Sequence, residues 1–164
     1  MALMEEKPYS RITVQDICKQ ADLSRQTFYN VFDSKEEILR FQMQLQYKKQ
    51  FQRFSDQSTI TVAEIVEAFT AVVEENDKLL QQMISNGLDS IIFDEVTKCV
   101  SLFAGHFVKE CGKNEMFPYA ETMLSGAVGY LLFYWFRQEN PISMDKLAYL
   151  ISEFLEGNLF ALVE

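Results

Sequence analysis

Two helix starts stand only ten residues apart in the stretch LSRQTFYNVFDSKEEIL, residues 23–39. Ser24 and Ser34 are residues of the type that caps helix N-termini. The interval leaves room for a helix of about two turns, and Phe28 and Phe32 fall on one face of it. A helix this short, with an aromatic face, is not stable alone. The chain must therefore fold so that neighbouring helices cover this one.

The segments on either side of this short helix predict helices that can pack against its aromatic face. ITVQDICKQA, just before, predicts a helix with Thr13 as N-cap and Asp16 in its first turn. Asp22 occupies the turn between the two helices and tolerates the left-handed conformation that a tight turn needs. Ser34 and Glu37 form a capping-box pattern that opens a long helix over 34–54. That helix carries the apolar side chains Ile38, Phe41, Leu45, Phe51 and Phe54. We therefore predict a helix, a tight turn, a second helix and a third that supports them.

The rest of the chain also favours helices. Among 164 residues there are only 6 Gly and 3 Pro, and 48% of the residues are hydrophobic. Apolar residues recur at helical spacing, and a second capping-box pattern begins at Thr61. No confident strand is found. We predict an all-α protein of about nine helices with a real hydrophobic core.

The short helix after Ser24 has an outer face suited to DNA. Arg25 and Tyr29 share that face, as do Gln26 and Asn30. Arg pairs with guanine and Gln or Asn with adenine in the major groove, whereas a Tyr hydroxyl contacts phosphates. The alternative is an ordinary amphipathic helix with a polar, solvated face.

The charge is distributed unevenly along the chain. The net charge is -9, but residues 1–54 hold nine Lys or Arg against seven Asp or Glu, and residues 55–164 hold six against seventeen. An acidic body would turn the basic end towards a phosphate backbone. Solubility is the simpler explanation of the acidic body, so charge alone does not decide.

The stretch ITVQDICKQADLSRQTFYNVFDSKEEIL resembles, along its whole length, the helix-turn-helix of the TetR/AcrR family of transcriptional regulators. The shared pattern is Ile-Thr-Val-x-Asp-Ile, then Ala-x-Leu-Ser-x-x-Thr-Phe-Tyr-x-x-Phe, then Ser-Lys-Glu-Glu-Ile-Leu. The resemblance implies that the helix at Ser24 is the recognition helix. It implies base contacts by Arg25, Gln26, Thr27 and Asn30, and phosphate contacts by Thr13, Tyr29 and Lys35.

The resemblance also implies a domain organisation. Residues 1–33 would form the DNA-binding head, residues 34–54 a connecting helix, and residues 55–164 a ligand-binding and dimerisation domain. We expect the connecting helix to be the only rigid link between head and body. The segment MALMEEK before Pro8 predicts a first helix that is two to three turns shorter than in the family.

The body offers candidates for a dimer interface and a ligand pocket. A helix from Pro118 to about Gln138 is apolar nearly all round, so one face needs a partner. We expect it to form a dimer interface with the last helix, through Gly126, Gly129, Phe133, Leu147, Ile151 and Phe154. The alternative is a central helix buried in a monomer. A pocket for a small apolar or aromatic ligand would be lined by Phe69, Met83, Phe93, Phe103, His106, Phe107, Tyr130 and Tyr134. For each of these residues the alternative is an ordinary core position.

Other classes of function find little support. His106 stands four residues before Glu110 and near Cys111, which is too few ligands for a metal site, so it is an ordinary helix histidine or a polar group of the pocket. Glu74-Glu75 and Asp94-Glu95 read as solvated faces rather than acid–base pairs. No nucleophile motif or phosphate loop is present. We expect no enzyme activity, no metal and no cofactor.

The compartment follows from similar reasoning. The cysteines, three in number, fit no metal spacing and read as small buried hydrophobes in a reducing compartment. There is no signal-peptide pattern, and the longest apolar run, residues 127–136, is too short for a membrane span. We expect a cytoplasmic protein that does not enter a membrane.

Two functions remain. The leading one is a dimeric repressor that binds a palindromic operator and is released by a small apolar ligand. The alternative is a protein of the same fold that acts through a protein partner without binding DNA. Binding to DNA would weaken steeply as salt is added, which separates the two. The ligand, the operator and the sign of regulation cannot be read from the sequence.

Overall fold

The computed structural model describes residues 2–54, 60–107 and 115–158, with the backbone alone at residues 104–107. These residues form α-helices and one short 3-10 helix, with no strand among them, so the all-α prediction is confirmed. The head contains α1 (Ala2–Glu6), η1 (Tyr9–Arg11), α2 (Val14–Gln20) and α3 (Arg25–Tyr29). The connecting helix is α4 (Lys35–Gln52). The body contains α5 (Val62–Glu75), α6 (Asp77–Ser85), α7 (Asp89–Phe107), α8 (Phe117–Phe136) and α9 (Met144–Leu155).

Most of the predicted helix starts are present. Thr13 and Thr61 each form a full capping box, with Asp16 and Glu64 as the third helical residue. Ser24 accepts a hydrogen bond from the amide of Thr27. Asp22 has a φ of +53°, so the left-handed turn predicted there is confirmed. Local side-chain chemistry therefore sets where these helices begin.

The capping box predicted at Ser34 is wrong. The Ser34 hydroxyl makes no capping hydrogen bond. The Glu37 carboxylate instead accepts the backbone amide of Asp33, one residue earlier, at 2.7 Å. The carboxylate still satisfies an exposed amide near the start of α4, where it also interacts favourably with the helix dipole.

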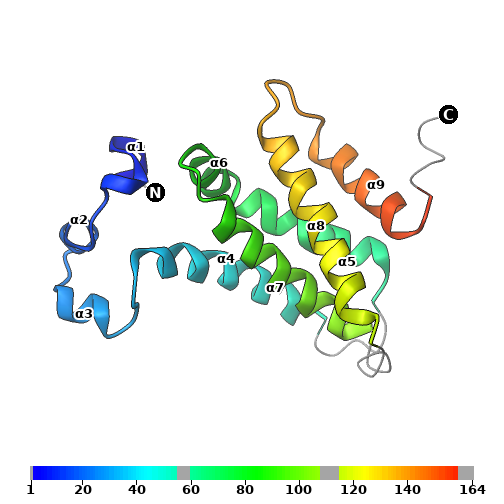
Figure 1. Ribbon diagram of the computed structural model, residues 1–164, viewed down its shortest axis with the longest axis horizontal. Coiled ribbons are helices and arrows are strands. Elements are labelled where there is room, and N and C mark those ends of the chain that lie inside the picture. The colour runs from blue at the N-terminus through cyan, green and yellow to red at the C-terminus, as the bar shows by residue number, and fades with distance from the viewer. Residues whose placement is uncertain (1, 55–59, 108–114, 159–164) are drawn as a thin grey trace.

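The head lies at one end of the molecule, and α4 runs from it into the body (Figure 1). Within the body α4 packs against α5 and α7. Helix α8 runs beside α7, and α9 packs against α5. The body is therefore a layered helical bundle, with α4 as its continuation into the head.

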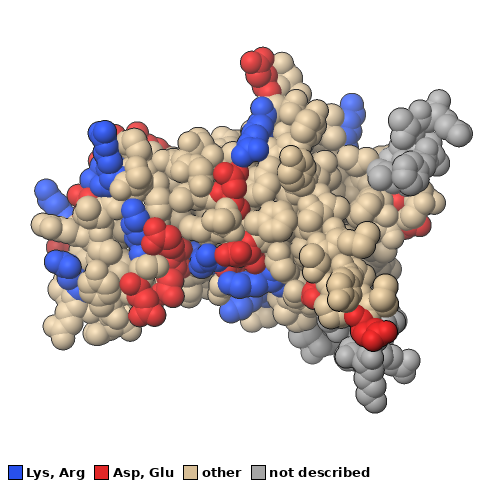
Figure 2. Space-filling view, viewed as in Figure 1, with Lys and Arg blue, Asp and Glu red and all other residues tan. Residues whose placement is uncertain are grey.

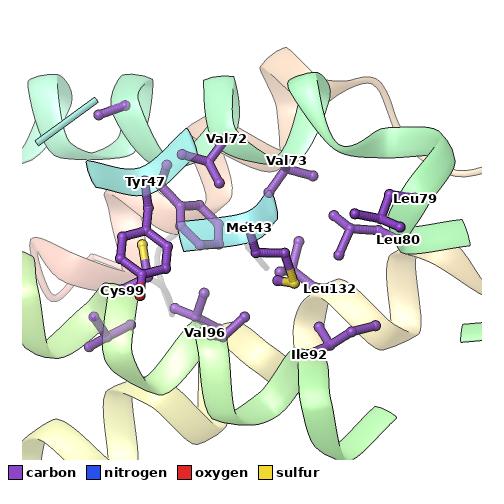
Figure 3. Close-up of a cluster of buried hydrophobic side chains, with 14 of the residues drawn as sticks. Met43, Tyr47, Val72, Val73, Leu79, Leu80, Ile92, Val96, Cys99 and Leu132 are labelled. Carbon is purple, nitrogen blue, oxygen red and sulfur yellow. The ribbon is translucent and has the colours of Figure 1, made fainter. Parts of the chain in front are cut away.

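The core is centred on the contact between α4 and α7. Met43 and Tyr47 of α4 point towards Ile92, Val96 and Cys99 of α7 (Figure 3). Side chains of α5, α6 and α8 close the cluster, namely Val72, Val73, Leu79, Leu80 and Leu132. Because the buried stripe of α4 packs between α5 and α7, the connecting helix cannot move without disturbing the packing of α7.

The buried stripe of the first part of α4 does not include Phe41 or Leu45. Leu39, Met43 and Tyr47 are the residues buried against the body. Phe41 and Leu45, two of the apolar residues noted in this helix from the sequence, are 49% and 48% exposed. Phe41 instead contacts Phe32, with ring centroids 5.7 Å apart, and so packs on the head.

A second link joins head and body. The backbone amide of Tyr9 donates a 2.8 Å hydrogen bond to Oδ1 of Asn86, at the end of α6. The Tyr9 side chain is only 6% exposed. Our expectation that the connecting helix is the only rigid link is therefore wrong, because η1 is also attached to the loop that leads into α7.

Candidate DNA-binding face and ligand cavity

Helix α3 is held from its inner side. Phe28 is 4% exposed and packs against Phe32, with ring centroids 5.8 Å apart. The Ser24 hydroxyl accepts the amide of Thr27 at 3.0 Å and lies 2.8 Å from the Thr27 hydroxyl. This anchor leaves the opposite face of α3 open to solvent.

The predicted base-contacting residues Arg25, Gln26, Thr27 and Asn30 are all exposed on that face. Within the described part of the chain, the side chains of Arg25, Gln26 and Asn30 make no hydrogen bond or ion pair. Tyr29 is 48% exposed, and its ring stands edge-on to Phe28. Except for the Thr27 hydroxyl, which lies 2.8 Å from that of Ser24, the side-chain donors and acceptors of the predicted base contacts are thus uncommitted.

The side chain of Lys35, a predicted phosphate contact, is bonded to the backbone of the head. Its ammonium donates to the carbonyl oxygens of Tyr9 and Ile12, at 2.9 and 2.8 Å. It also lies 4.2 Å from the centre of the Tyr9 ring, within the range of a cation–π interaction. These contacts fix η1 onto the start of α4. Two of its three N–H groups are thus used within the head, where Lys35 has a structural role.

The Thr13 hydroxyl is also committed within the head. It donates to Oδ2 of Asp16 at 2.7 Å and accepts the Asp16 amide at 3.2 Å. Lys7 pairs with the same carboxylate oxygen at 2.8 Å. The hydrogen bonds from Lys7 and Thr13 hold the pKa of Asp16 well below its ordinary value. With its only proton engaged, the Thr13 side chain does not fit the predicted phosphate contact.

Basic side chains collect at the head end of the molecule (Figure 2). Arg11, Lys19 and Arg25 are exposed there, and none of them has an ion-pair partner in the described residues. Unpaired cations near an exposed helix attract a phosphate backbone at no cost in broken ion pairs. These three cations are therefore better placed to contact phosphates than Lys35 and Thr13.

An apolar cavity of about 320 Å³ opens among α5, α7, α8 and α9. Phe69 and Phe103, two of the predicted pocket residues, line it. The other lining residues are Val62, Ile65, Val66, Cys99, Val100, Phe117, Ala120, Glu121, Leu124, Val128, Ile151 and Leu155. Burial, followed by the charge of Glu95, raises the pKa of the Cys99 thiol to about 12, so this thiol stays neutral. A cavity of this size, with a nearly apolar lining, suits a small apolar ligand.

The remaining pocket predictions do not match the cavity. Met83 is fully buried in the core, and Phe93 stacks on Phe133 with ring centroids 6.2 Å apart. Tyr130 and Tyr134 are 74% and 62% exposed, on the outer side of α8. These four residues therefore do not line this cavity. The side chains of His106 and Phe107 lie outside the described residues.

The predicted dimer interface also needs correction. Phe133, Leu147 and Ile151 are between 0% and 7% exposed, because they face the core of their own chain. Gly129 faces inward too, since a Cβ atom there would lie 3.0 Å from the Phe93 ring. Buried residues cannot offer surface to a second copy. Of the predicted set, only Phe154 and the position of Gly126 remain accessible.

The accessible side of α8 carries a different set of residues. Four large side chains lie there at intervals of one or two helical turns, and Gly126 lies between them. We name these five residues the α8 outer face: Tyr119, Met123, Gly126, Tyr130 and Tyr134. The four large side chains are 62–76% exposed. Figure 2 shows few charged side chains over α8. The helical spacing could have revealed this face in the sequence, but not which side of α8 the core would occupy.

Two sets of contacts join the cavity to α4. Phe103, which lines the cavity, packs edge-on against Phe51 and Phe54, with ring centroids 5.7 and 6.1 Å apart. One turn before Cys99, Glu95 is fully buried and its oxygens lie 3.2 Å from Arg40 and 3.3 Å from the Tyr47 hydroxyl, both on α4. The expectation of a solvated acidic pair at 94–95 is therefore wrong for Glu95.

Residues 1–40, which span α1 to α3 and the start of α4, match the model of the tetR family of bacterial regulatory proteins. The match supports a helix-turn-helix DNA-binding domain of the tetR type in the head, as the sequence motif indicates. The comparisons with curated proteins and with solved structures gave no match. In the parts of the chain that the structure describes, no helix is both long and apolar enough to cross a membrane.

Proposed function

We propose that this protein is a tetR-family repressor that binds a palindromic operator as a homodimer and leaves it when a small apolar ligand enters the cavity. The proposal rests on the presence of two candidate binding sites in the same packed set of helices. Uncommitted polar side chains on α3 lie at one end, and an apolar cavity lies at the other. DNA access implies that the protein works in the cytoplasm.

The α8 outer face supports the dimer. Monomeric proteins rarely expose a continuous apolar face of this kind. Pairing of two copies through α8, about a two-fold axis, would cover Tyr130 and Tyr134 and would leave both heads free. Two heads related by such an axis match the two halves of a palindrome, with recognition helices roughly 34–36 Å apart.

Release follows from the contacts between cavity and α4. A ligand that enters between α5, α7 and α8 displaces Phe103, and Phe103 packs on Phe51 and Phe54 at the far end of the connecting helix. A small tilt of α4 moves α3, and in a dimer the tilt changes the spacing of the two heads. By linkage, DNA must then weaken ligand binding by the same factor as the ligand weakens DNA binding.

The test is a mobility-shift titration of the full chain on operator DNA, selected from random sequence, at several salt concentrations. Arg25→Ala should weaken specific binding by roughly 1–3 kcal/mol and relax base choice. Tyr29→Phe, which removes only a hydroxyl, should weaken binding to all sequences alike. Lys48→Ala is the control, because Lys48 is exposed on α4 and its replacement removes one positive charge.

The outcomes separate the two functions. Binding that falls steeply with added salt, and that depends on Arg25 far more than on Lys48, supports the regulator. If the full chain retains no DNA at low salt, the DNA-binding proposal fails, and a protein partner becomes the function to test. If ligand affinity is the same with and without operator, the release mechanism fails although DNA binding stands.

A further inference from the structure

Helix α8 presents one charged residue to the cavity. Phe117, Ala120, Glu121, Leu124 and Val128 are spaced as one face of a helix, and all five line the cavity. Ala120 is exposed and Glu121 is half-buried, whereas Val128 is buried, so the cavity is open towards the N-terminal end of α8. Glu121 is the only ionisable carboxyl among the described lining residues, and it lies at that open end.

The Glu121 carboxylate has no partner among the residues that the structure describes. Other acidic residues of the body pair with basic ones, as Asp89 does with Arg137 at 2.7 Å and Asp94 with Arg40 at 2.8 Å. Within the described chain, the Glu121 side chain makes no hydrogen bond or ion pair. The Ser125 hydroxyl donates to the backbone carbonyl of Glu121, at 2.8 Å, and leaves the carboxylate alone.

An unpaired carboxylate at an apolar opening selects among ligands. A ligand that fills the cavity displaces the water around Glu121, and a carboxylate that loses water without gaining a partner raises the free energy of the complex. A positively charged group on the ligand replaces that water with an ion pair. A negatively charged group would be repelled, both by Glu121 and by the acidic body.

We propose that the cavity binds amphiphilic cations, with the apolar part among α5, α7 and α8 and an ammonium or similar group at Glu121. This inference rests on the proposed ligand-sensing function and names the chemical class of its ligand. It also explains why an otherwise apolar face of α8 carries a carboxylate at this turn.

The experiment compares three probes of one length, 6-phenylhexylamine, 6-phenylhexan-1-ol and 6-phenylhexanoate, by calorimetric titration of the full chain. The amine should bind about fivefold more tightly than the alcohol, which is the size expected of a partly exposed ion pair. The carboxylate should bind more weakly than the alcohol. Glu121→Gln should reduce amine binding to the level of the alcohol.

Glu115→Gln is the matched control. It removes the same charge from an exposed residue just before α8 that does not line the cavity, and it should leave the preference for the amine unchanged. Unchanged binding of the alcohol to Glu121→Gln would show that this variant keeps its fold.

Two results would overturn the inference alone: equal binding of amine and alcohol to the unaltered protein, or a preference that survives in Glu121→Gln. If none of the probes binds, the cavity is not a ligand site and the sensing function fails together with the inference.

Discussion

Gly126 and Gly129 lie about one turn apart on α8, but only Gly129 is in close contact with a side chain of its own core, so replacing each by Leu separates core packing from dimer formation. A Cβ atom at residue 129 would lie 3.0 Å from Cε2 and 3.2 Å from Cδ2 of Phe93. That ring cannot retreat freely, because it is stacked on Phe133. At residue 126 a Cβ atom would meet no atom within 4 Å.

The magnitude follows from two effects. Replacing a helical Gly by Leu gains roughly 0.8 kcal/mol of helix propensity, and this gain applies to both variants. Overpacking against the Phe93 ring costs about 1–3 kcal/mol and applies only to Gly129→Leu. The free energies of unfolding of the two single chains should therefore differ by about 1–3 kcal/mol, with Gly126→Leu the more stable.

The assay is urea unfolding followed by circular dichroism, at protein concentrations low enough for dimer dissociation, since subunit binding otherwise adds to the measured stability. Sedimentation at higher concentration then reports the dimer. Gly126→Leu should sediment as a folded monomer, because an isobutyl group on the α8 outer face holds the two copies apart.

Two results would refute this reasoning. Equal unfolding free energies would mean that Gly129 does not face the core as the structure has it. A Gly126→Leu protein that dimerises as tightly as the unaltered chain would mean that the α8 outer face is not the interface.

Two further predictions concern charged groups. Glu95→Gln should lower the free energy of unfolding by about 2 kcal/mol, because it removes the charge and one of the two buried oxygens that accept from Arg40 and Tyr47 on α4. Asp94→Asn, at an exposed position, should cost less than about 1 kcal/mol. Equal losses by urea unfolding would contradict the buried network. The pKa of Asp16 is lowered in the folded head by its hydrogen bonds with Lys7 and Thr13, so its stabilising contribution is present above the unfolded pKa of about 4 and is lost as the pH falls through the folded value. The stability advantage of the unaltered chain over Asp16→Asn should thus be larger at pH 6 than at pH 3 in urea unfolding, and an advantage independent of pH would show that the carboxylate does not act through its charge.

The sequence alone determined the helical class, most helix starts and the helix-turn-helix of the head. The physical reason is that these features depend on residues three or four positions apart. The caps at Ser24 and Thr61 need only the first turn of their own helix, and Asp22 needs only its own backbone angles. The motif around α3 is local in the same sense, so the order of its residues along the chain is enough to identify it.

Only the tertiary structure decided which face of each long helix is buried. Helix α8 is apolar on both sides, so periodicity could not show that Phe133 faces inward and Tyr130 outward. Lys35 turned inward because η1 and the residue after it offered two carbonyl oxygens, 26 and 23 residues away along the chain. Glu95 became a buried acceptor through donors on α4, such as Tyr47, 48 residues away. Partners so distant in sequence meet only when the helices pack, and for that reason the cavity and its link to the head belong to the fold.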